Sequence, residues 1–195
     1  EVMPRLAATV GHEEATKRYR AMVAVLLEQL EGLTNTHVRF CYSPGDAGEA
    51  IRFWLLPQLR GHVIKQGNSF LFTPKKNAPA LSVDFMAQGN GDLGLRIERA
   101  TIQAFDDGYK KVAVIGTNCV HCGSRWINAA FLQATDDRCV IGPSEDGGYY
   151  LLATAKKSAQ LFQNIPWGSK RTLSETEHAA KNSGLSVVHL PQLID

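Results

Sequence analysis

The sequence predicts a three-layer α/β/α sandwich with a mostly parallel central sheet, formed by a single domain over residues 1–195. Two observations lead to this prediction. Apolar residues recur at helical spacing in several segments, and short apolar or alternating runs typical of strands lie between these segments. Strands that alternate with helices favour parallel pairing, because each helix returns the chain to the edge where the next strand begins.

Composition and charge narrow the class of protein. The 21 Lys and Arg against 19 Asp and Glu leave a net charge of +2, so we expect no nucleic-acid partner, which would need a concentrated basic face. No apolar run approaches the roughly 20 residues that span a bilayer, and residues 1–5 do not form a secretion signal. Four irregularly spaced cysteines do not suit a disulfide-stapled module. We therefore expect a cytoplasmic protein without a membrane span. The sequence does not indicate its oligomeric state.

The first half of the chain opens with an amphipathic helix over residues 12–32. Its expected inward face consists of Ala15, Tyr19, Met22, Val23, Leu26, Leu27, Leu30 and Leu33. A strand follows in which Val38, Phe40 and Tyr42 alternate with polar residues, and a short helix around Ile51 comes after a break at residues 43–46. Residues 57–90 mix short apolar pieces with Gly, Pro, Asn and Lys, and we assign no element there.

The second half alternates helices and strands more regularly. The inward face expected for a helix over residues 92–106 consists of Leu93, Ile97, Ala100, Ala104 and Phe105. Residues 111–117 are a continuous apolar run, which predicts a strand buried on both faces. We expect further helices over residues 124–134 and 171–183, and further strands over 139–142, 148–154 and 186–190.

Three clusters that could carry chemistry follow predicted strands, where ligands bind in open α/β sheets. The first, residues 116–120, places Asn118 after the buried strand, where it is either an oxygen ligand for Mg²⁺ or Mn²⁺ or a residue that caps the next helix or closes a turn. The second, residues 142–150, has Glu145 and Asp146 before two glycines. It is either a metal or sugar site or the Asp-Gly turn of a hairpin.

The third cluster, residues 88–96, is a glycine-rich loop that opens a helix. Its backbone N–H groups could hold an anion or a ribose, although the glycine spacing does not fit the dinucleotide fingerprint; the alternative is a helix start capped by Asp92. Two smaller features also have alternative interpretations. Cys119 and Cys122 have the C-x-x-C spacing of redox or zinc sites, but they lack a thioredoxin-like context and a second zinc-ligand pair. Trp167 either closes over an acceptor or packs between layers.

The order and spacing of the clusters resemble a bacterial family of small GT-A-type nucleotide-diphospho-sugar transferases, some of which are associated with arsenosugar biosynthesis. The matching motifs are Q-x-x-G-D-L-G-x-R at 88–96, I-G-T-N-C at 115–119, G-P-x-x-D-G-G-Y-Y-L at 142–151 and I-x-W-x-S at 165–169. Val2-x-x-Arg5-Leu6 is similar to the family's V-K-T-R-L segment. The resemblance covers nearly the whole chain, more loosely over residues 34–85.

The resemblance implies a nucleotide-diphospho-sugar transferase-like fold and transfer of a sugar from a nucleoside diphosphate sugar to a small acceptor, with Mg²⁺ or Mn²⁺. It implies the following roles: Arg5, Gln88, Gly91, Asp92, Gly94 and Arg96 at the nucleotide and its phosphates; Asn118 and Asp146 as catalytic residues and metal ligands; Gly147, Gly148, Tyr149 and Trp167 at the sugar and acceptor. It also implies that the family's first strand would precede residue 1 and that a further acidic segment would follow residue 195.

Three residues depart from the family pattern. Asn118 stands where the family has Asp, Val120 where it has Pro, and Met3 where it has Lys. A neutral amide binds a divalent metal more weakly than a carboxylate does, because it supplies an oxygen without a charge. Two alternatives to the glycosyltransferase therefore stay open: a non-enzymatic relative that keeps the fold and pocket, and a nucleotidyltransferase that consumes a nucleoside triphosphate.

Overall fold

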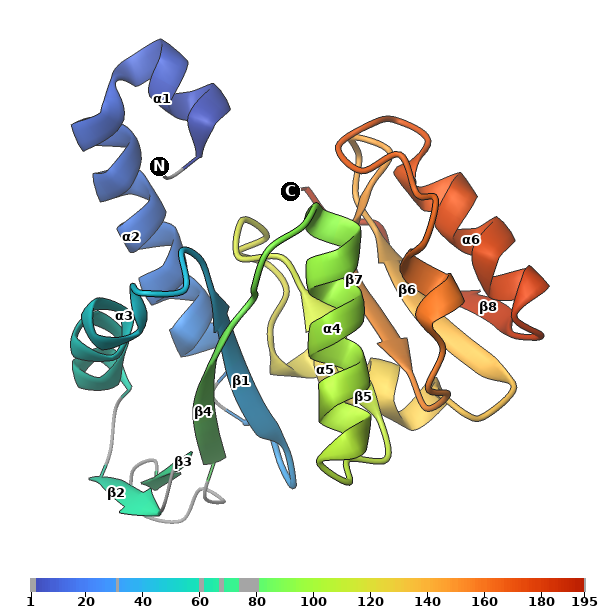
Figure 1. The fold of residues 1–195 in the computed structure, drawn as a ribbon, viewed down its shortest axis with the longest axis horizontal. Helices are drawn as coiled ribbons and strands as arrows, with labels where there is room; N and C mark the ends of the chain where they lie inside the picture. Colours follow the sequence, from blue (N-terminus) through green and yellow to red (C-terminus); the bar gives the residue numbers. More distant parts are fainter. Residues whose placement is uncertain (1–2, 31, 60–61, 67–68, 74–80, 195) are drawn as a thin grey trace.

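The strands of the described part of the chain form two four-stranded sheets (Figure 1). The computed structural model describes residues 3–30, 32–59, 62–66, 69–73 and 81–194. The first sheet has the order β1-β4-β3-β2, formed by β1 (His37–Tyr42), β2 (His62–Gln66), β3 (Ser69–Thr73) and β4 (Leu81–Ala87). The second has the order β5-β7-β6-β8, formed by β5 (Val112–Ile115), β6 (Arg138–Pro143), β7 (Tyr149–Thr154) and β8 (Ser186–His189).

The α/β class is confirmed, but the prediction of one mostly parallel sheet is wrong. Among the strands of the described residues, β1 with β4 and β6 with β8 pair in parallel, whereas β2–β3, β3–β4, β5–β7 and β6–β7 are antiparallel. The strands β2, β3 and β4 fall in residues 57–90, where no element was assigned because glycines, prolines and lysines interrupt the alternation. The hairpin between β6 and β7 has no helix in its connection, so these two strands must run in opposite directions.

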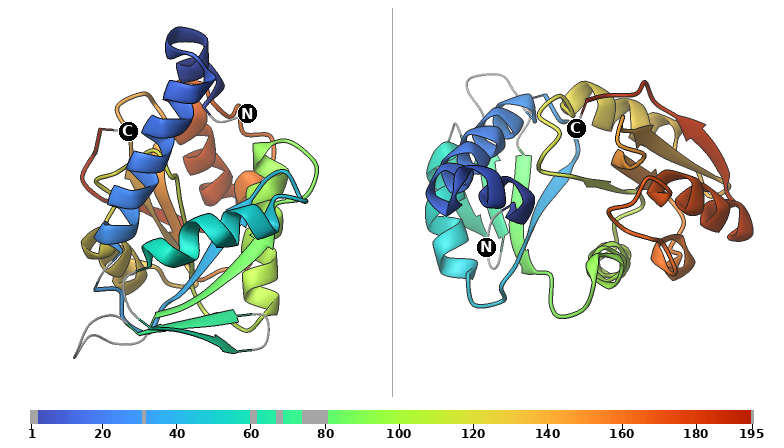
Figure 2. Two further views of the ribbon diagram at one scale, coloured as in Figure 1. Left: turned by 90° about the vertical axis from the view of Figure 1, so that its left-hand side faces the viewer. Right: turned by 90° about the horizontal axis from the view of Figure 1, so that it is seen from above.

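The helices cover both sides of the strands (Figure 2). They are α1 (Pro4–Val10), α2 (His12–Gln29), α3 (Gly48–Leu55), α4 (Leu93–Asp106), α5 (Ser124–Gln133) and α6 (Thr172–Asn182), with short 3₁₀ turns η1 (Leu56–Gln58) and η2 (Ala159–Phe162). α2 and α5 lie on one side, and α4, η2 and α6 lie on the other. The predicted helices are confirmed, and α1, which starts with a proline suited to the first helical turn, was not expected.

One hydrophobic core runs behind both sheets. It joins Val23 and Leu27 of α2 to Val83 of β4, Ile127 of α5 and Leu151 of β7. Of the eight residues predicted to face inward near α2, six are buried, and Tyr19 and Met22 are half-buried. A second, smaller core lies on the opposite face of the second sheet, under η2 and α6. The three-layer arrangement is therefore present around the second sheet.

Two predictions about burial are wrong. Leu93, the first residue of α4, is 49% exposed, and the buried residues of this helix are Gly94 and Thr101, the latter only 1% exposed. Ile97, as predicted, packs against the core and is half-buried. All four residues of β5 are half-buried rather than buried on both faces. The reason is that, within the described chain, β5 has a neighbouring strand only on the edge that pairs with β7.

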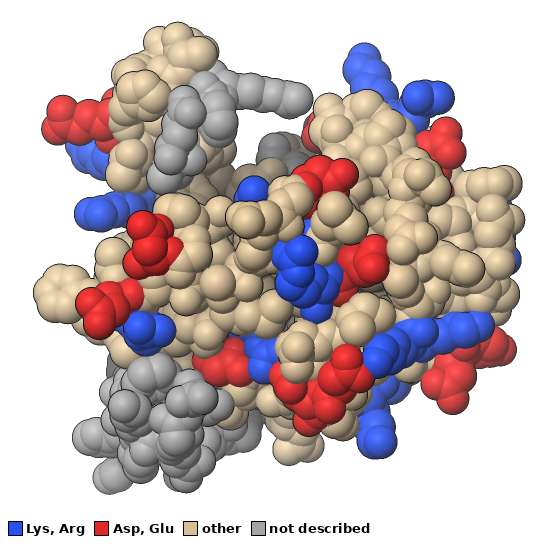
Figure 3. All heavy atoms as spheres, in the orientation of Figure 1, with Lys and Arg blue, Asp and Glu red and all other residues tan. Residues whose placement is uncertain are grey.

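The surface carries charges of both signs. Acidic and basic side chains are interspersed over the face shown in Figure 3, as expected from a net charge of +2. Among the described residues, no helix combines the length and apolarity that crossing a membrane requires.

Candidate functional site

The carboxyl ends of β1, β4, β5 and β6 lie at one end of the molecule (Figure 1). β1 and β4 are parallel, and α4 returns the chain from the end of β4 to the start of β5. β5 and β6 both pair antiparallel with β7 and therefore run in the same direction. The three predicted clusters thus extend from the same end of the two sheets.

Two arginines of α4 hold the glycine-rich loop after β4. Arg96 Nε donates to Gly91 O at 2.9 Å, and its Nη1 contacts Ser43 Oγ and Gln88 Oε1 at 3.4 and 3.5 Å. Arg99 donates to Gln88 O and, at 2.9 Å, to Asn90 O. The loop is therefore pre-formed around guanidinium groups. Sequence analysis missed Ser43 and Arg99, although Ser43 directly follows a strand, which is the signal used for the other clusters.

The start of α4 is closely packed. Asp92 caps the helix by accepting a hydrogen bond from Leu95 N at 2.9 Å, as the structural alternative for this residue predicted. A Cβ at Gly94 would lie 2.5 Å from Trp167 Nε1 and 2.7 Å from Phe162 O, so only glycine fits there. Trp167 in turn meets Tyr149 edge-to-face at 6.1 Å between ring centroids. Gly94, Trp167 and Tyr149 thus connect the loop after β4 with the β6–β7 hairpin, and Trp167 packs between layers.

Asn118 is exposed in the loop after β5. The side-chain Oδ1 of Asn118 lies over Gly116, where an added Cβ would be 2.7 Å from it. The backbone carbonyl of Asn118 accepts a hydrogen bond from Val120 N at 3.1 Å. It does not cap α5, whose N-cap residue is Gly123. The neighbouring Thr117 Oγ1 lies 3.3 Å from Tyr19 Oη of α2, a contact that sequence analysis did not find because 98 residues separate the two.

Asp146 stabilises the turn of the β6–β7 hairpin. Its Oδ1 accepts hydrogen bonds from Ser144 Oγ at 2.7 Å and from Gly148 N at 2.9 Å. Gly147 has a φ of 88°, and a Cβ there would lie 2.5 Å from Lys170 O, so this position requires glycine on both counts. The cluster therefore forms the turn of a hairpin, and Asp146 itself is exposed at the hairpin tip.

The segment that follows β8, residues 191–194, contacts the end of β6, the strand β7 and the loop after β5. Tyr150 Oη donates to Pro191 O at 3.0 Å, Leu193 N donates to Pro143 O at 3.1 Å, and Cys119 Sγ lies 3.6 Å from Ile194 O. Burial raises the pKa of the Tyr150 hydroxyl, so it stays a donor at neutral pH. Nothing in the sequence pattern identified this segment as part of the site.

The cysteines do not form an accessible redox pair. Cys119 and Cys122 are 0% exposed, and none of the four cysteines forms a disulfide. Reactive thiols need solvent access, so the structure gives no support to the redox interpretation of the C-x-x-C spacing. No group of three or more His, Cys, Asp or Glu suited to a metal occurs in the described part of the chain.

The oxygen ligands that Asn118 and Asp146 offer fit a divalent cation only when other ligands complete its shell. Asn118 and Asp146 offer one amide and one carboxylate, and Asp146 already uses Oδ1 in its turn. Mg²⁺ commonly binds through one or two carboxylates while water and substrate phosphates complete its shell. The residues present therefore fit a cation that arrives with a diphosphate, and not one held by protein ligands alone.

The N-terminal residues are placed only in part. Arg5 belongs to α1, but its side chain lies outside the described part of the structure, so its predicted position at the phosphates is not tested. Met3 is the N-cap residue of α1 with a φ of 49°.

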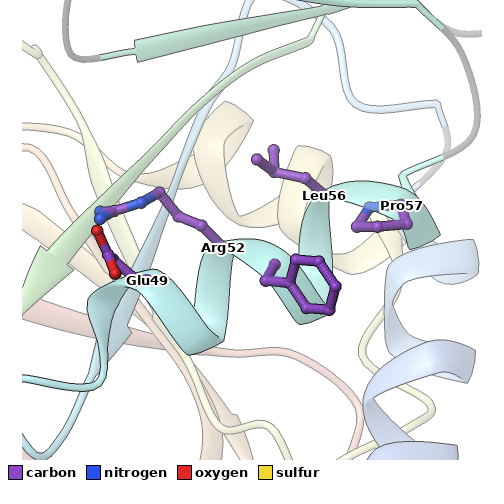
Figure 4. Close-up of a pocket in the computed structure, with 5 residues that line it drawn as sticks. Glu49, Arg52, Leu56 and Pro57 are labelled. Atoms are coloured by element: carbon purple, nitrogen blue, oxygen red, sulfur yellow. The ribbon is translucent and has the colours of Figure 1, made fainter.

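Figure 4 shows an open hollow on α3 and η1, lined by Glu49, Arg52, Phe53, Leu56 and Pro57. It contains none of the predicted site residues.

Comparisons with known proteins bear on this arrangement. A structure-based search matches a solved structure from Desulfovibrio desulfuricans G20 that carries the provisional name nucleotide-diphospho-sugar transferase. The TM-score is 0.76 at 29% sequence identity, and the match covers all of this chain and 77% of the other. No curated protein matches the chain. Residues 26–169 match the DUF2064 family, described as an uncharacterized protein conserved in bacteria. Because this match spans most of the 195 residues, the chain belongs to the DUF2064 family.

Proposed function

We propose that the protein is a glycosyltransferase that moves a sugar from a nucleoside diphosphate sugar to a small acceptor. The observation that carries the proposal is the convergence of loops 88–92, 116–123 and 144–148 at one end of the sheets, on a fold that resembles the Desulfovibrio structure. In open α/β sheets, ligands bind at the carboxyl ends of strands, and these loops occupy that position.

The residues present suit recognition of a nucleotide diphosphate. The loop 88–92 offers backbone N–H groups at the start of α4, where the helix dipole favours an anion, and Arg96 lies beside it. Arg5 is proposed to face the phosphates. Gln88, Gly91, Asp92 and Gly94 are proposed to line the nucleoside, and Gly147, Gly148, Tyr149 and Trp167 the sugar and acceptor.

The chemistry requires compensation of charge on the leaving group. The bond between the anomeric carbon and the diphosphate oxygen breaks, and a bond from that carbon to the acceptor hydroxyl oxygen forms. The hydroxyl proton is released to water, and the nucleoside diphosphate leaves with added negative charge. A divalent cation supplies positive charge at that oxygen when it is bound. Asn118 and Asp146 are proposed to orient the cation and the diphosphate from two neighbouring loops.

Asp146→Asn tests the proposed metal role without removing the turn. The amide oxygen of asparagine can still accept from Ser144 and Gly148, so the hairpin should keep its conformation while the charge is lost. We expect Mn²⁺-dependent binding of a nucleoside diphosphate sugar, measured by isothermal titration calorimetry over a panel of donors, to weaken about tenfold or more. Glu145→Gln, at the exposed neighbouring acid, is the matched control. An equal loss in both variants would show a general charge effect and contradict the assignment.

A second candidate, a non-enzymatic relative, is favoured by Asn118, which gives the site one carboxylate fewer than the family pattern. The variant Asn118→Asp distinguishes the glycosyltransferase from the non-enzymatic relative. If the protein is an enzyme, the variant should bind Mn²⁺ about tenfold more tightly while the parent already shows metal-dependent donor binding. Donor hydrolysis or metal binding found only in the variant would identify the parent as the non-enzymatic relative. Asn182→Asp, which adds the same charge on α6, is the control, and release of pyrophosphate from a nucleoside triphosphate would indicate nucleotidyl transfer instead.

A further inference from the structure

The helix α3 has two apolar faces. Its inner face, formed by Ile51, Trp54 and Leu55, packs on the core that runs behind both sheets. On its outer face Phe53 is 85% exposed, more than any other large apolar residue that the structure describes. Aromatic residues are enriched at protein interfaces, and a ring this exposed beside other apolar side chains is typical of a surface that binds another protein.

The hollow beside Phe53 has the geometry that receives a side chain from a facing helix. Four of its lining residues, Glu49, Arg52, Phe53 and Leu56, occupy positions i, i+3, i+4 and i+7 of one helical surface. In packed helices, four residues of one helix form the hole into which one side chain of the other helix inserts. Glu49 and Arg52 lie at one end of the hollow, and Leu56 and Pro57 lie at the other (Figure 4).

The shape of the hollow favours a helix over a small molecule as its occupant. The hollow is open, with a volume of about 420 Å³, and all of its lining residues come from the single segment 49–57. Sites for small molecules are concave and enclose most of the ligand. A surface formed by one helix contacts only one side of a ligand, whereas it can pack along the length of a second helix.

This surface is complementary to itself. Phe53, the side chain that would fill the hollow of a facing helix, lies directly beside its own hollow, and the two charged residues at one end carry opposite signs. A two-fold axis brings the same patch of two copies together, so that patch must contain the inserting side chain, the hole and both signs of charge. The outer face of α3 has all three, whereas a different kind of partner would not require them on one patch.

We propose that α3 and η1 form a self-association surface, on which two copies of the chain dock with their α3 helices antiparallel about a two-fold axis. Phe53 of each copy inserts into the hollow of the other. Arg52 then lies near the middle of the interface, from which its long side chain reaches Glu49 of the other copy, so that opposite charges meet. Five residues are fewer than the roughly 20 a side of a standard interface, so the dimer is weak, with a dissociation constant on the order of 10–100 µM.

Sedimentation velocity over protein concentrations of about 5 to 500 µM tests the proposal, because this range spans the expected dissociation constant. The parent should change from monomer to dimer over the range. Phe53→Asp, which places a charge in the facing hollow, should raise the dissociation constant about tenfold or more. Leu132→Asp is the matched control, because Leu132 is 83% exposed but lies on α5, so this variant should dimerise like the parent.

Exchanging the charges tests the two-fold arrangement. Glu49→Arg makes all four charges of a dimer basic, and Arg52→Glu makes all four acidic, so each variant alone should be monomeric over the same range. An equimolar mixture of the two variants should form a heterodimer, because the patch of one is then basic and the patch of the other acidic.

Three outcomes would overturn the proposal. They are a parent that is monomeric at every concentration, a dimer that Phe53→Asp and Leu132→Asp weaken equally, and a mixture of the two charge variants that does not associate. The first would indicate that this face binds a different kind of partner. The hollow contains none of the predicted site residues, so these outcomes do not bear on donor binding and are distinguishable from a failure of the proposed function.

Discussion

Asp84→Ala is expected to lower the free energy of unfolding by about 2–3 kcal/mol. Asp84 accepts from Arg39 Nε and Nη2 at 2.9 and 2.7 Å, and its Oδ2 lies 3.1 Å from His37 Nε2. The side chains of Arg39 and His37 are 18% and 9% exposed, so losing Asp84 leaves both poorly solvated. The loss stays below that of a fully buried pair because Arg39 keeps Asp107. Urea denaturation measures it, and Asp136→Ala, at an exposed acid, should change stability by less than about 0.5 kcal/mol.

The same variant changes the dependence of stability on pH. Burial would raise the pKa of Asp84, but hydrogen bonds from His37 and Arg39 outweigh it and lower the pKa to about 2, from a usual 3.8. A carboxyl whose folded pKa is lowered stabilises the fold above its unfolded pKa, and this stabilisation is lost as the pH falls from about 4 to about 2. The stability difference between parent and Asp84→Ala should therefore shrink over that window. A difference that stayed constant down to pH 2 would show that the charge of Asp84 does not contribute.

Gly142→Ala is expected to cost about 3 kcal/mol or more, the upper range for overpacking a core. Gly142 lies in β6 directly under the ring of Tyr150, and an added Cβ would stand 2.6 and 2.7 Å from two ring carbons. Tyr150 is 1% exposed and its hydroxyl is held by Pro191 O, so the ring has no room to move away. Thermal unfolding followed by circular dichroism measures the loss.

Two further variants show whether the clash is the cause. Gly45→Ala meets no atom within 4 Å, so it should leave stability within about 0.5 kcal/mol of the parent. Combining Gly142→Ala with Tyr150→Val removes the clash, so the double variant should lose clearly less stability than the two single losses added together. Simple additivity would show that Gly142 matters for a reason other than the Tyr150 ring.

Elements with their own periodicity could be predicted from the sequence, whereas those that depend on distant partners could not. The apolar spacing of Val23, Leu27 and Leu30 identified α2 and its buried face, and alternation identified β1. The strands β2, β3 and β4 were missed because residues 57–90 mix short apolar pieces with Gly, Pro, Asn and Lys. β5 was predicted as a strand, but its half-burial depends on a second neighbour, and four apolar residues in sequence cannot report whether one is present.

The candidate site divides in the same way. The rule that ligands bind after strands located the loops after β5 and β6, because those strands were predicted, whereas the loop at 88–96 follows β4, which was not assigned, and was found from its glycines. It could not show that one carboxylate oxygen of Asp146 accepts hydrogen bonds within its own turn, that Trp167 packs against Gly94, or that residues 191–194 run between the loops.

The sequence by itself thus determined the α/β class, most helices and the positions of the three candidate loops, since these follow from local periodicity and turn residues. Only the tertiary structure decided how the described strands pair and which polar groups already have hydrogen-bond partners. The physical reason is that pairing and burial depend on contacts between residues such as Tyr19 and Thr117, 98 positions apart, which no local pattern records.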